Sequence, residues 1–294
     1  MLEDVPTDLP LLIAGPTASG KSAMALALAE RDGREIINAD ALQVFENWRI
    51  LTARPSPEEE ARVPHVLYGH IAGHAPYSVG DWLRDLAPFL RKEPAPVIVG
   101  GTGLYFTALT EGLADIPTVP DDIRARATDL LAQGGLGALL DELDPLTRVR
   151  IDTANPVRVQ RAWEVLQATG EGLAVWQDRP IAPLLPRDRC HAMVIDAPRD
   201  WLTPRIEQRF GVMLAQGALD EARANASTWN PQWPSAKAIG AQDLIAYLNA
   251  EISLDEARDR AVIATRQYAK RQRTWLRARM RGWHWIPAEE IVAH

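Results

Sequence analysis

Eight consecutive residues near the N-terminus have the types and the spacing needed to bind a phosphate chain. They match the pattern G-x-x-x-x-G-K-[ST] and lie between a short apolar run, residues 11–14, and a segment of good helix formers, residues 23–30. In such a strand–loop–helix unit, backbone N–H groups and the positive end of the helix point at the ligand. The predicted diphosphate-binding residues are Gly15, Pro16, Thr17, Ala18, Ser19, Gly20, Lys21 and Ser22.

The last two residues of this loop add chemistry that backbone amides lack. Lys21 places a positive charge on the phosphates. The hydroxyl of Ser22 can enter the coordination shell of Mg²⁺, an ion that is commonly bound together with substrate phosphates. We therefore expect Mg²⁺ as cofactor, with Ser22 as its protein ligand.

Two further strands are expected to end in polar residues beside this site. Residues 35–40 indicate a core strand ending in Asp40, and residues 96–99 a strand followed by a Gly-Gly-Thr-Gly turn that contains Thr102. Ligands of open parallel sheets bind at the carboxyl ends of the strands. Asp40 either faces the phosphate site or caps a helix, and Thr102 either caps the next helix or binds substrate.

The composition excludes several classes of protein. A chain of 294 residues, 47% hydrophobic and 24% charged, is typical of one large α/β domain or a core with a smaller insertion. No apolar run reaches the ~20 residues of a membrane span, and the acidic N-terminus lacks the features of a signal peptide. The single cysteine, Cys190, excludes an internal disulfide. We expect a cytoplasmic protein with no membrane partner.

Charge is distributed unevenly along the chain. The net charge is −7, yet residues 265–281 hold seven Lys or Arg and no acid, so the rest of the chain carries −14. A long helix is predicted over residues 251–281. It would place Arg266, Lys270, Arg273, Arg277 and Arg281 in one basic stripe. A basic surface on an acidic body is typical of nucleic-acid binding, although several of these side chains could instead pair with acids of the same protein.

The composition and the periodicity of the sequence change in the middle of the chain. Between residues 115 and 189, prolines mark both ends and the interior has helical periodicity without a convincing strand. We predict an α/β core with a parallel sheet, formed by residues 1–116 and 188–294, and an α-helical insertion over residues 117–187. The best-defined helix of the insertion runs from Asn155 to Gly170.

Six segments together resemble the bacterial tRNA dimethylallyltransferase family. They are GPTASGKS, INAD, LTARPSPEEEARVPHVLYGH, GGTGLY, NPVRVQRA and TRQYAKRQRTWLR, and they cover most of the chain in the family's order. The resemblance implies a P-loop NTPase-like core with a helical tRNA-binding insertion. It also implies transfer of a dimethylallyl group from dimethylallyl diphosphate to the exocyclic amine of the adenine 3′-adjacent to the anticodon.

That chemistry agrees with the predicted site. A delocalised exocyclic amine needs a general base, for which Asp40 is suited, and the Thr102 hydroxyl can orient the amine. The resemblance further implies Arg223 as an active-site cation. It implies that the anticodon stem-loop of tRNA contacts Asp40, Ala41, Leu42, Gln43, Thr102, Arg124, Val157, Arg158, Val159, Gln160, Arg161, Lys237, Gly240 and Gln242.

The chain departs from the family pattern at a few positions, and other functions remain open at this point. Ala41 and Phe45 stand where the family commonly has Ser and Tyr, and residues 240–243 lack the family's Tyr and Arg. The main alternative is a small-molecule P-loop kinase. Others are an RNA-binding protein without catalysis and an enzyme that prenylates free adenine nucleotides. We expect a monomer.

Overall fold

The computed structural model describes residues 5–179 and 182–292 of the chain. It divides into two compact units, one formed by the residues up to Glu111 and from Leu184 onward, the other by Gly112–Pro183. The boundaries predicted from the sequence, at residues 116/117 and 187/188, lie slightly C-terminal to these. The first unit contains the sheet, and the second consists of helices.

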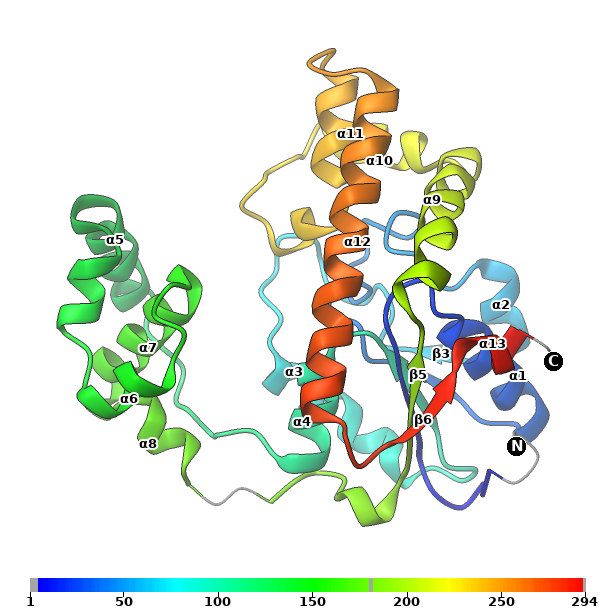
Figure 1. Cartoon of the computed structure of the whole chain (residues 1–294), viewed down its shortest axis with the longest axis horizontal. Helices are drawn as coiled ribbons and strands as arrows, with labels where there is room; N and C mark the ends of the chain where they lie inside the picture. Colours follow the sequence, from blue (N-terminus) through cyan, green and yellow to red (C-terminus); the bar gives the residue numbers. More distant parts are fainter. Residues whose placement is uncertain (1–4, 180–181, 293–294) are drawn as a thin grey trace. The chain divides into compact units, whose positions relative to one another are not determined.

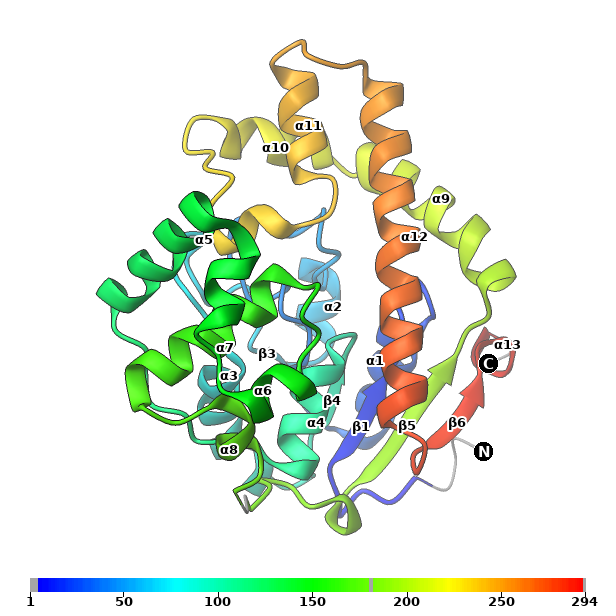
Figure 2. The ribbon, with the colours of Figure 1, turned by 60° about the vertical axis from the view of Figure 1, so that its left-hand side comes forward.

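A single six-stranded sheet forms the centre of the first unit, with strand order β3-β2-β4-β1-β5-β6 and every pair parallel (Figures 1 and 2). The strands are β1 (Leu11–Ala14), β2 (Ile36–Asn38), β3 (His65–Val66), β4 (Val97–Gly100), β5 (His191–Asp196) and β6 (His284–Pro287). The predicted parallel α/β core is therefore confirmed. Because all strands are parallel, their carboxyl ends meet at one edge of the sheet.

Both faces of the sheet are buried, which explains why its strands are continuous apolar runs. Leu11 and Ile13 of β1 pack into one hydrophobic cluster with α1 (Lys21–Asp32) and α9 (Arg199–Ala215). Leu12 of β1 enters a second cluster with α3 (Val79–Leu86) and α4 (Gly103–Glu111). Successive side chains of one strand thus hold helices on opposite faces.

The C-terminal half of the first unit adds a helical layer that ends in the predicted basic helix. The remaining elements of this unit are α2 (Pro57–Arg62), η1 (Ala87–Arg91), η2 (Arg187–Arg189), α10 (Ala218–Ala226), η3 (Pro234–Lys237), α11 (Ala241–Leu248), α12 (Leu254–Arg279) and α13 (Ala288–Val292). Gly240, at φ +89°, separates η3 from α11. Ala261 of α12 packs in the first cluster and Leu276 in the second, so this one helix contributes to both cores.

The second unit has its own small core. It contains α5 (Asp121–Asp141), α6 (Pro145–Arg150), α7 (Pro156–Thr169) and α8 (Leu173–Gln177), and its described residues form no strand. Val159 and Trp163 of α7 are fully buried against α5. Asn155 caps the first turn of α7, and Gly170 ends it in the left-handed conformation. The helical insertion predicted from the sequence is thus a compact body.

Across the described residues, no helix combines the length and the apolarity needed to cross a bilayer.

The end of β4 makes a test of the sheet packing possible. A Cβ atom on Gly100 would lie 2.0 Å from the carbonyl oxygen of Ala39, which is rigid backbone. Gly100→Ala should therefore lower the free energy of unfolding by about 1–3 kcal/mol, the usual cost of overpacking. In α9, by contrast, a Cβ on Gly211 meets nothing within 4 Å. Gly211→Ala should raise stability by about 0.5–1 kcal/mol. Urea unfolding midpoints of the two variants test both signs, and equal midpoints would refute the packing argument.

Candidate active site

The phosphate-binding loop joins β1 to α1 in the arrangement that its motif predicts. Gly20 adopts φ +93° and ψ 0° at the N-terminus of α1, and no side chain caps this end of the helix. The first N–H groups of α1 are therefore left for a ligand. Gly15 must lack a side chain, because a Cβ there would lie 2.8 Å from Oγ of Ser19 and 3.2 Å from Cβ of Ile195.

Lys21 is partly buried inside the loop. Its Nζ donates to the carbonyl oxygen of Pro16 at 3.2 Å. Burial lowers the pKa of Lys21 to about 8, while the negative charge of Asp40 opposes this shift and the positive charge of Arg209 adds to it. A bound diphosphate would stabilise the protonated form of Lys21. The loop is therefore suited to bind an anion.

Asp40 follows β2 in a tight loop that is fixed by hydrogen bonds. Asn38 Oδ1 accepts from the Asp40 N–H at 2.8 Å, and Asn38 Nδ2 donates to the Asp40 carbonyl at 2.9 Å. Asp40 Oδ1 accepts from the Leu42 N–H at 3.0 Å, whereas none of the described residues donates to Oδ2. The next helix of this segment, α2, begins only at Pro57, so Asp40 does not cap a helix.

Thr102 connects the loop after β4 to the loop that carries Asp40. Its Oγ1 accepts from the Ala41 N–H at 2.9 Å, and its backbone N–H donates to Ala39 at 3.2 Å. Thr102 directly precedes α4, yet its side chain is engaged with the neighbouring loop. The Thr102 side chain therefore lies beside the loop of Asp40, and its contact with substrate stays a prediction.

One cavity of about 80 Å³ is lined by the charged and polar side chains that could take part in a reaction. Its walls include Lys21 and Ser22 of the phosphate-binding loop, Asp40 after β2, Arg209 of α9 and Tyr268 of α12. Burial, together with the charge of Asp40, raises the pKa of Tyr268, so this phenol remains protonated. We call this space the P-loop cavity.

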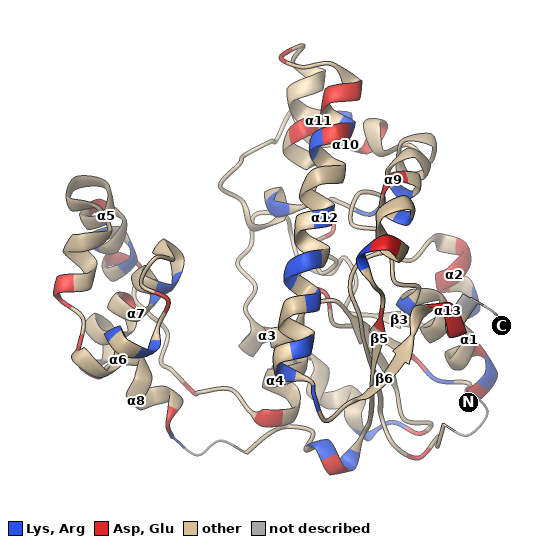
Figure 3. Ribbon diagram, viewed as in Figure 1, with Lys and Arg blue, Asp and Glu red and all other residues tan. Residues whose placement is uncertain are grey.

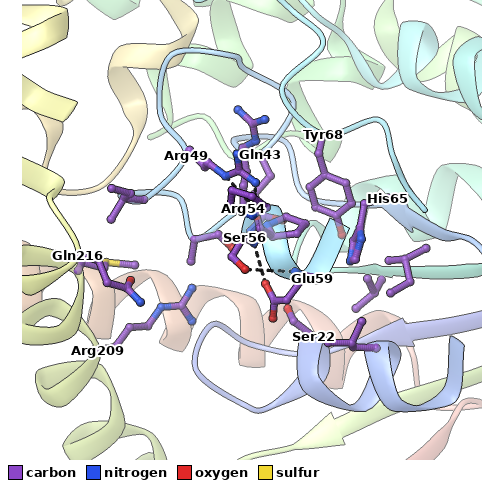
Figure 4. Close-up of a pocket in the computed structure, with 18 of the residues that line it drawn as sticks. Ser22, Gln43, Arg49, Arg54, Ser56, Glu59, His65, Tyr68, Arg209 and Gln216 are labelled. Carbon is purple, nitrogen blue, oxygen red and sulfur yellow. Dashed lines mark hydrogen bonds between the residues drawn. The ribbon is translucent and has the colours of Figure 1, made fainter. Parts of the chain in front are cut away.

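Two larger spaces adjoin the P-loop cavity and share lining residues with it. The first, of about 500 Å³, shares Ser22 and Arg209 and has mostly apolar walls. Figure 4 shows Arg209 and Gln216 at one end of this space and His65 and Tyr68 at the other. The second, an open groove of about 460 Å³ that we call the Thr102 groove, shares Leu42 and Tyr268. Both spaces thus adjoin the cavity that Lys21 and Asp40 line.

The arginine of the P-loop cavity is Arg209, which sequence reasoning missed. Arg209 lines both the P-loop cavity and the apolar space, and burial lowers its pKa while the charge of Asp40 raises it. Arg223 is an exposed residue of α10, paired with Asp220 at 2.5 Å, and lines neither of these spaces. The sequence predicts Arg223 as the active-site cation, but the arginine that lines this cavity in the structure is Arg209. In the sequence, Arg209 is one arginine of an amphipathic helix, and no recognised motif marks it as a functional residue.

Gln272 is a second residue that the sequence did not single out. Its Oε1 accepts from the Thr17 N–H at 2.9 Å, and its Nε2 donates to the Gly101 carbonyl at 3.0 Å. The side chain is buried, with 5% of its surface exposed. Gln272 thereby joins the phosphate-binding loop to the loop that carries Thr102.

The predicted tRNA contacts fall into three groups. Asp40, Ala41, Leu42, Gln43, Thr102 and Lys237 line the P-loop cavity or the Thr102 groove. Arg124, Val157, Arg158 and Arg161 are in the second unit, with Val157, Arg158 and Arg161 exposed on α7. The remaining residues line neither the P-loop cavity nor the Thr102 groove. Val159 is fully buried, and Gly240 packs against Phe210. The side chain of Gln160 bonds to Glu164, and Gln242 is exposed on α11.

Val159 and Gly240 are therefore corrected as tRNA contacts. Val159 faces inward because α7 buries one side against the core of its own unit. Gly240 is buried because it forms the tight turn before α11, where a Cβ would lie 3.1 Å from Phe210. Periodicity identifies the helix. A family motif does not tell which of its residues are buried to support a binding surface and which are exposed on that surface.

Exchanging each arginine separately tests the assignment of Arg209. Arg209→Gln removes a charge from the P-loop cavity and should weaken diphosphate binding by about 10- to 100-fold, as expected for a lost charge-assisted contact of about 1.5–3 kcal/mol. Arg223→Gln, with the same change of charge, should bind like the wild type. Calorimetric titration with inorganic diphosphate measures both. A larger loss in the Arg223 variant would reverse the assignment.

The lowered pKa of Lys21 predicts a pH dependence of binding. Below pH 8, Lys21 of the free protein is protonated and its charge is available to the ligand. As the pH rises through about 8, this charge is lost, so affinity should fall. Lys21→Arg keeps its charge throughout this range and should lack that part of the fall. Titrations with inorganic diphosphate between pH 7 and 9 compare the two proteins, and identical profiles would exclude Lys21 as the titrating group.

Comparison with known proteins places this site in a family. The family described as IPP transferase matches residues 43–279, and that described as isopentenyl transferase matches residues 10–66. A tRNA dimethylallyltransferase from Dinoroseobacter shibae is 60% identical, over 97% of both chains. Another, from a Ruegeria species, is 56% identical, over 96% of both.

Solved structures agree. The full-length tRNA isopentenylpyrophosphate transferase from Bacillus halodurans is 28% identical, covers 97% of this chain and 94% of its own, and has a TM-score of 0.65. A eukaryotic dimethylallyltransferase acting on tRNA, 24% identical, shares the fold with a TM-score of 0.79 over 95% of this chain and 74% of its own. Taken with the P-loop cavity and the Thr102 groove beside it, these similarities show that the chain is a prenyltransferase and belongs to the tRNA dimethylallyltransferase family.

Proposed function

We propose that the protein transfers a dimethylallyl group from dimethylallyl diphosphate to the exocyclic amine of the adenine 3′-adjacent to the anticodon of tRNA. The observation that carries this proposal is the P-loop cavity, where Lys21 and Ser22 face the same space as Asp40. A diphosphate site and a carboxylate with a free oxygen are the two elements that the reaction requires.

The reaction exchanges one bond at the allylic carbon for another. The amine nitrogen forms a bond to C1 of the dimethylallyl group, and the bond from C1 to the diphosphate oxygen breaks. Diphosphate leaves with the bonding electrons, and its growing charge is stabilised by the loop amides, Lys21 and Arg209. The amine loses one proton, which Asp40 Oδ2 accepts.

The loop geometry suits Asp40 to this task. Oδ1 is engaged by the Leu42 N–H, which orients the carboxylate and leaves Oδ2 for the substrate. Thr102, bonded to the adjacent Ala41 N–H, lines the groove on the acceptor side. We infer that the target base enters by the Thr102 groove, after leaving the stack of the anticodon loop, since a stacked base cannot reach a cavity of this size.

The oxygen donors of the site fit Mg²⁺ bound through the substrate. No cluster of three or more His, Cys, Asp or Glu that could hold a metal exists among the described residues. Ser22 presents a hydroxyl to the P-loop cavity. Mg²⁺ commonly keeps several waters and uses one or two protein oxygens with substrate phosphates, so Ser22 would hold it there, and the ion would neutralise charge on the leaving diphosphate.

Further features agree with the proposal. The acceptor side carries Lys237 and Arg271, a charge that suits tRNA and has no evident use in a small-molecule kinase. A tRNA substrate also agrees with the cytoplasmic location expected from the sequence.

The direct test is mass spectrometry of tRNA nucleosides after incubation with the protein, Mg²⁺ and dimethylallyl diphosphate. A mass increase on the adenine beside the anticodon is expected. Formation of ADP from ATP with small acceptors, without tRNA modification, would instead establish a kinase.

The role of Asp40 as general base predicts the behaviour of one conservative variant. Asp40→Asn keeps an oxygen that can accept from the Leu42 N–H, so the loop should be preserved. It cannot take a proton, and single-turnover prenylation should fall by about 10²- to 10⁴-fold. The melting temperature and the affinity for tRNA should change little. A wild-type rate in this variant would remove Asp40 from the mechanism.

A further inference from the structure

One acidic residue of α10 has no cation as its partner. Figure 3 shows acidic and basic residues on the helices from α9 to α12, and several of them pair with one another. Asp220 is paired with Arg223, and Glu207 of α9 with Arg266. Glu221 follows Asp220 on α10, is half-buried and forms no ion pair with a described residue. A half-buried charge must be balanced in another way.

The carboxylate of Glu221 accepts three backbone hydrogen bonds from one loop. Its Oε1 accepts from the N–H groups of Arg49 at 2.5 Å and Ile50 at 2.9 Å, and its Oε2 accepts from the Leu51 N–H at 3.0 Å. Successive N–H groups that converge on one anion offset its charge with their dipoles. Such charge-assisted bonds are stronger than bonds between neutral groups. Glu221 is therefore bound to a stretch of backbone and not to another side chain.

A second residue of α10 holds the start of the same loop. Asn225 lies one turn after Glu221, on the same side of the helix. Its Nδ2 donates to the Asn47 carbonyl at 2.8 Å, and its Oδ1 accepts from Asn47 Nδ2 at 3.0 Å. The two side chains of α10 thus bond to backbone groups of residues 47 and 49–51. We call residues 47–53 the 47–53 loop.

The shape of the 47–53 loop depends on these partners. None of the helices and strands in the described part of the chain includes the loop. Ala53 adopts φ +53°, a left-handed conformation that is unfavourable for a residue with a Cβ atom. At this end, Gln43 Nε2 donates to the carbonyls of Thr52 and Ala53, both at 2.9 Å. The loop is therefore held by α10 on one side and by the segment after Asp40 on the other.

The 47–53 loop contributes to the walls of two spaces at the site. Ile50 and Ala53 line the apolar space, whereas Leu51 and Thr52, which lie between them in the sequence, line the P-loop cavity. The two spaces also share Ser22 of the phosphate-binding loop. A donor whose diphosphate is bound there has its five-carbon group in or beside this cavity. The loop is thus placed to touch the carbon part of the donor.

We propose that Glu221 is a positioning residue for the transfer reaction, which holds the 47–53 loop in the shape that accepts the five-carbon group of dimethylallyl diphosphate. The inference rests on the proposed function. Glu221 lines neither the P-loop cavity nor the apolar space, so it acts through the loop and does not touch the substrate. Its effect is confined to the carbon part of the donor, because other groups bind the diphosphate.

Two variants of neighbouring residues test this assignment. E221Q keeps the size of the side chain but replaces one carboxylate oxygen by an NH₂ group, which cannot accept a hydrogen bond from the loop. D220N makes the same change of charge on the same turn of α10. Asp220 is exposed and is bonded to Arg223, not to the loop, which makes D220N the matched control.

The measurements separate the two parts of the donor. Steady-state prenylation of tRNA gives the KM for dimethylallyl diphosphate, and calorimetric titration gives the affinity for inorganic diphosphate. In E221Q, the KM for dimethylallyl diphosphate should rise about tenfold or more, as expected for lost hydrogen bonds to a charged group. The affinity of E221Q for inorganic diphosphate should equal that of the wild type. D220N should behave like the wild type in both measurements.

A purely structural role of Glu221 would give a different pattern. Partial unfolding lowers the fraction of active protein and therefore kcat, but leaves the KM of the folded molecules unchanged. The stoichiometry of the diphosphate titration and a melting curve show how much of each protein is folded. The inference is overturned if folded E221Q has the wild-type KM, if it binds inorganic diphosphate equally weakly, or if D220N shows the same rise.

A second variant keeps the test valid if E221Q does not fold. E221D retains the charge and both acceptor oxygens, but its side chain is shorter by one methylene group. It should raise the KM for dimethylallyl diphosphate in the same direction and by a smaller factor. A wild-type KM in E221D would then overturn the inference, because the position of the carboxylate would have no influence on the donor.

The outcome is separable from that of the proposed function. If the wild type prenylates tRNA and E221Q does so with an unchanged KM, only the role of Glu221 is wrong. If the wild type modifies no tRNA in the nucleoside assay, the proposed function itself fails.

Discussion

The arrangement of the site depends on a buried amide, that of Gln272, which bonds to two loops from different strands. Thr17 of the loop after β1 donates to it, and the Gly101 carbonyl of the loop after β4 accepts from it. Because water has little access, these bonds have no competitor and hold the loops at a fixed spacing. Gly101 must lack a side chain for this contact, since a Cβ there would lie 2.2 Å from Nε2 of Gln272.

Through this bridge, a helix from the C-terminal part of the chain supports a site whose loops come from the N-terminal part. Gln272 comes from α12, and the same helix contributes Tyr268 to the P-loop cavity and Leu276 to the sheet core. Arg266 and Arg277 secure the helix to α9 and β5. One face of α12 therefore positions the two loops of the site.

The charges of the P-loop cavity follow the requirements of the reaction. Lys21 and Arg209 lose solvent there, which lowers the pKa of each, and the carboxylate of Asp40 partly compensates them. A leaving diphosphate would complete this compensation. Tyr268 in this cavity and Tyr68 in the adjoining apolar space keep their protons, because burial and the charge of Asp40 raise the pKa of both. The site thus combines cations for the departing group with a single carboxylate that can accept a proton.

Local sequence was sufficient to predict the parallel α/β core, the phosphate-binding loop and the helical insertion. Each is encoded over a few neighbouring residues: an apolar strand, Gly20 before Lys21, or Asn155 and Gly170 at the ends of α7. The position of Asp40 was also predictable, because a residue that ends a parallel strand lies at the ligand-binding edge. The resemblance to a family added the substrates.

The tertiary structure alone decided which arginines serve the site. Arg209 and Arg223 both lie on amphipathic helices, and only the packing of α9 brings Arg209 to the P-loop cavity. The ion pairs of Arg266 and Arg277 on α12 likewise depend on Glu207 and Asp196, which are distant in sequence. Gln272 shows the same limit, since its partners are more than 170 residues away along the chain. The periodicity of a sequence predicts which residues share one face of a helix. Which other elements pack against that face is decided by the tertiary structure.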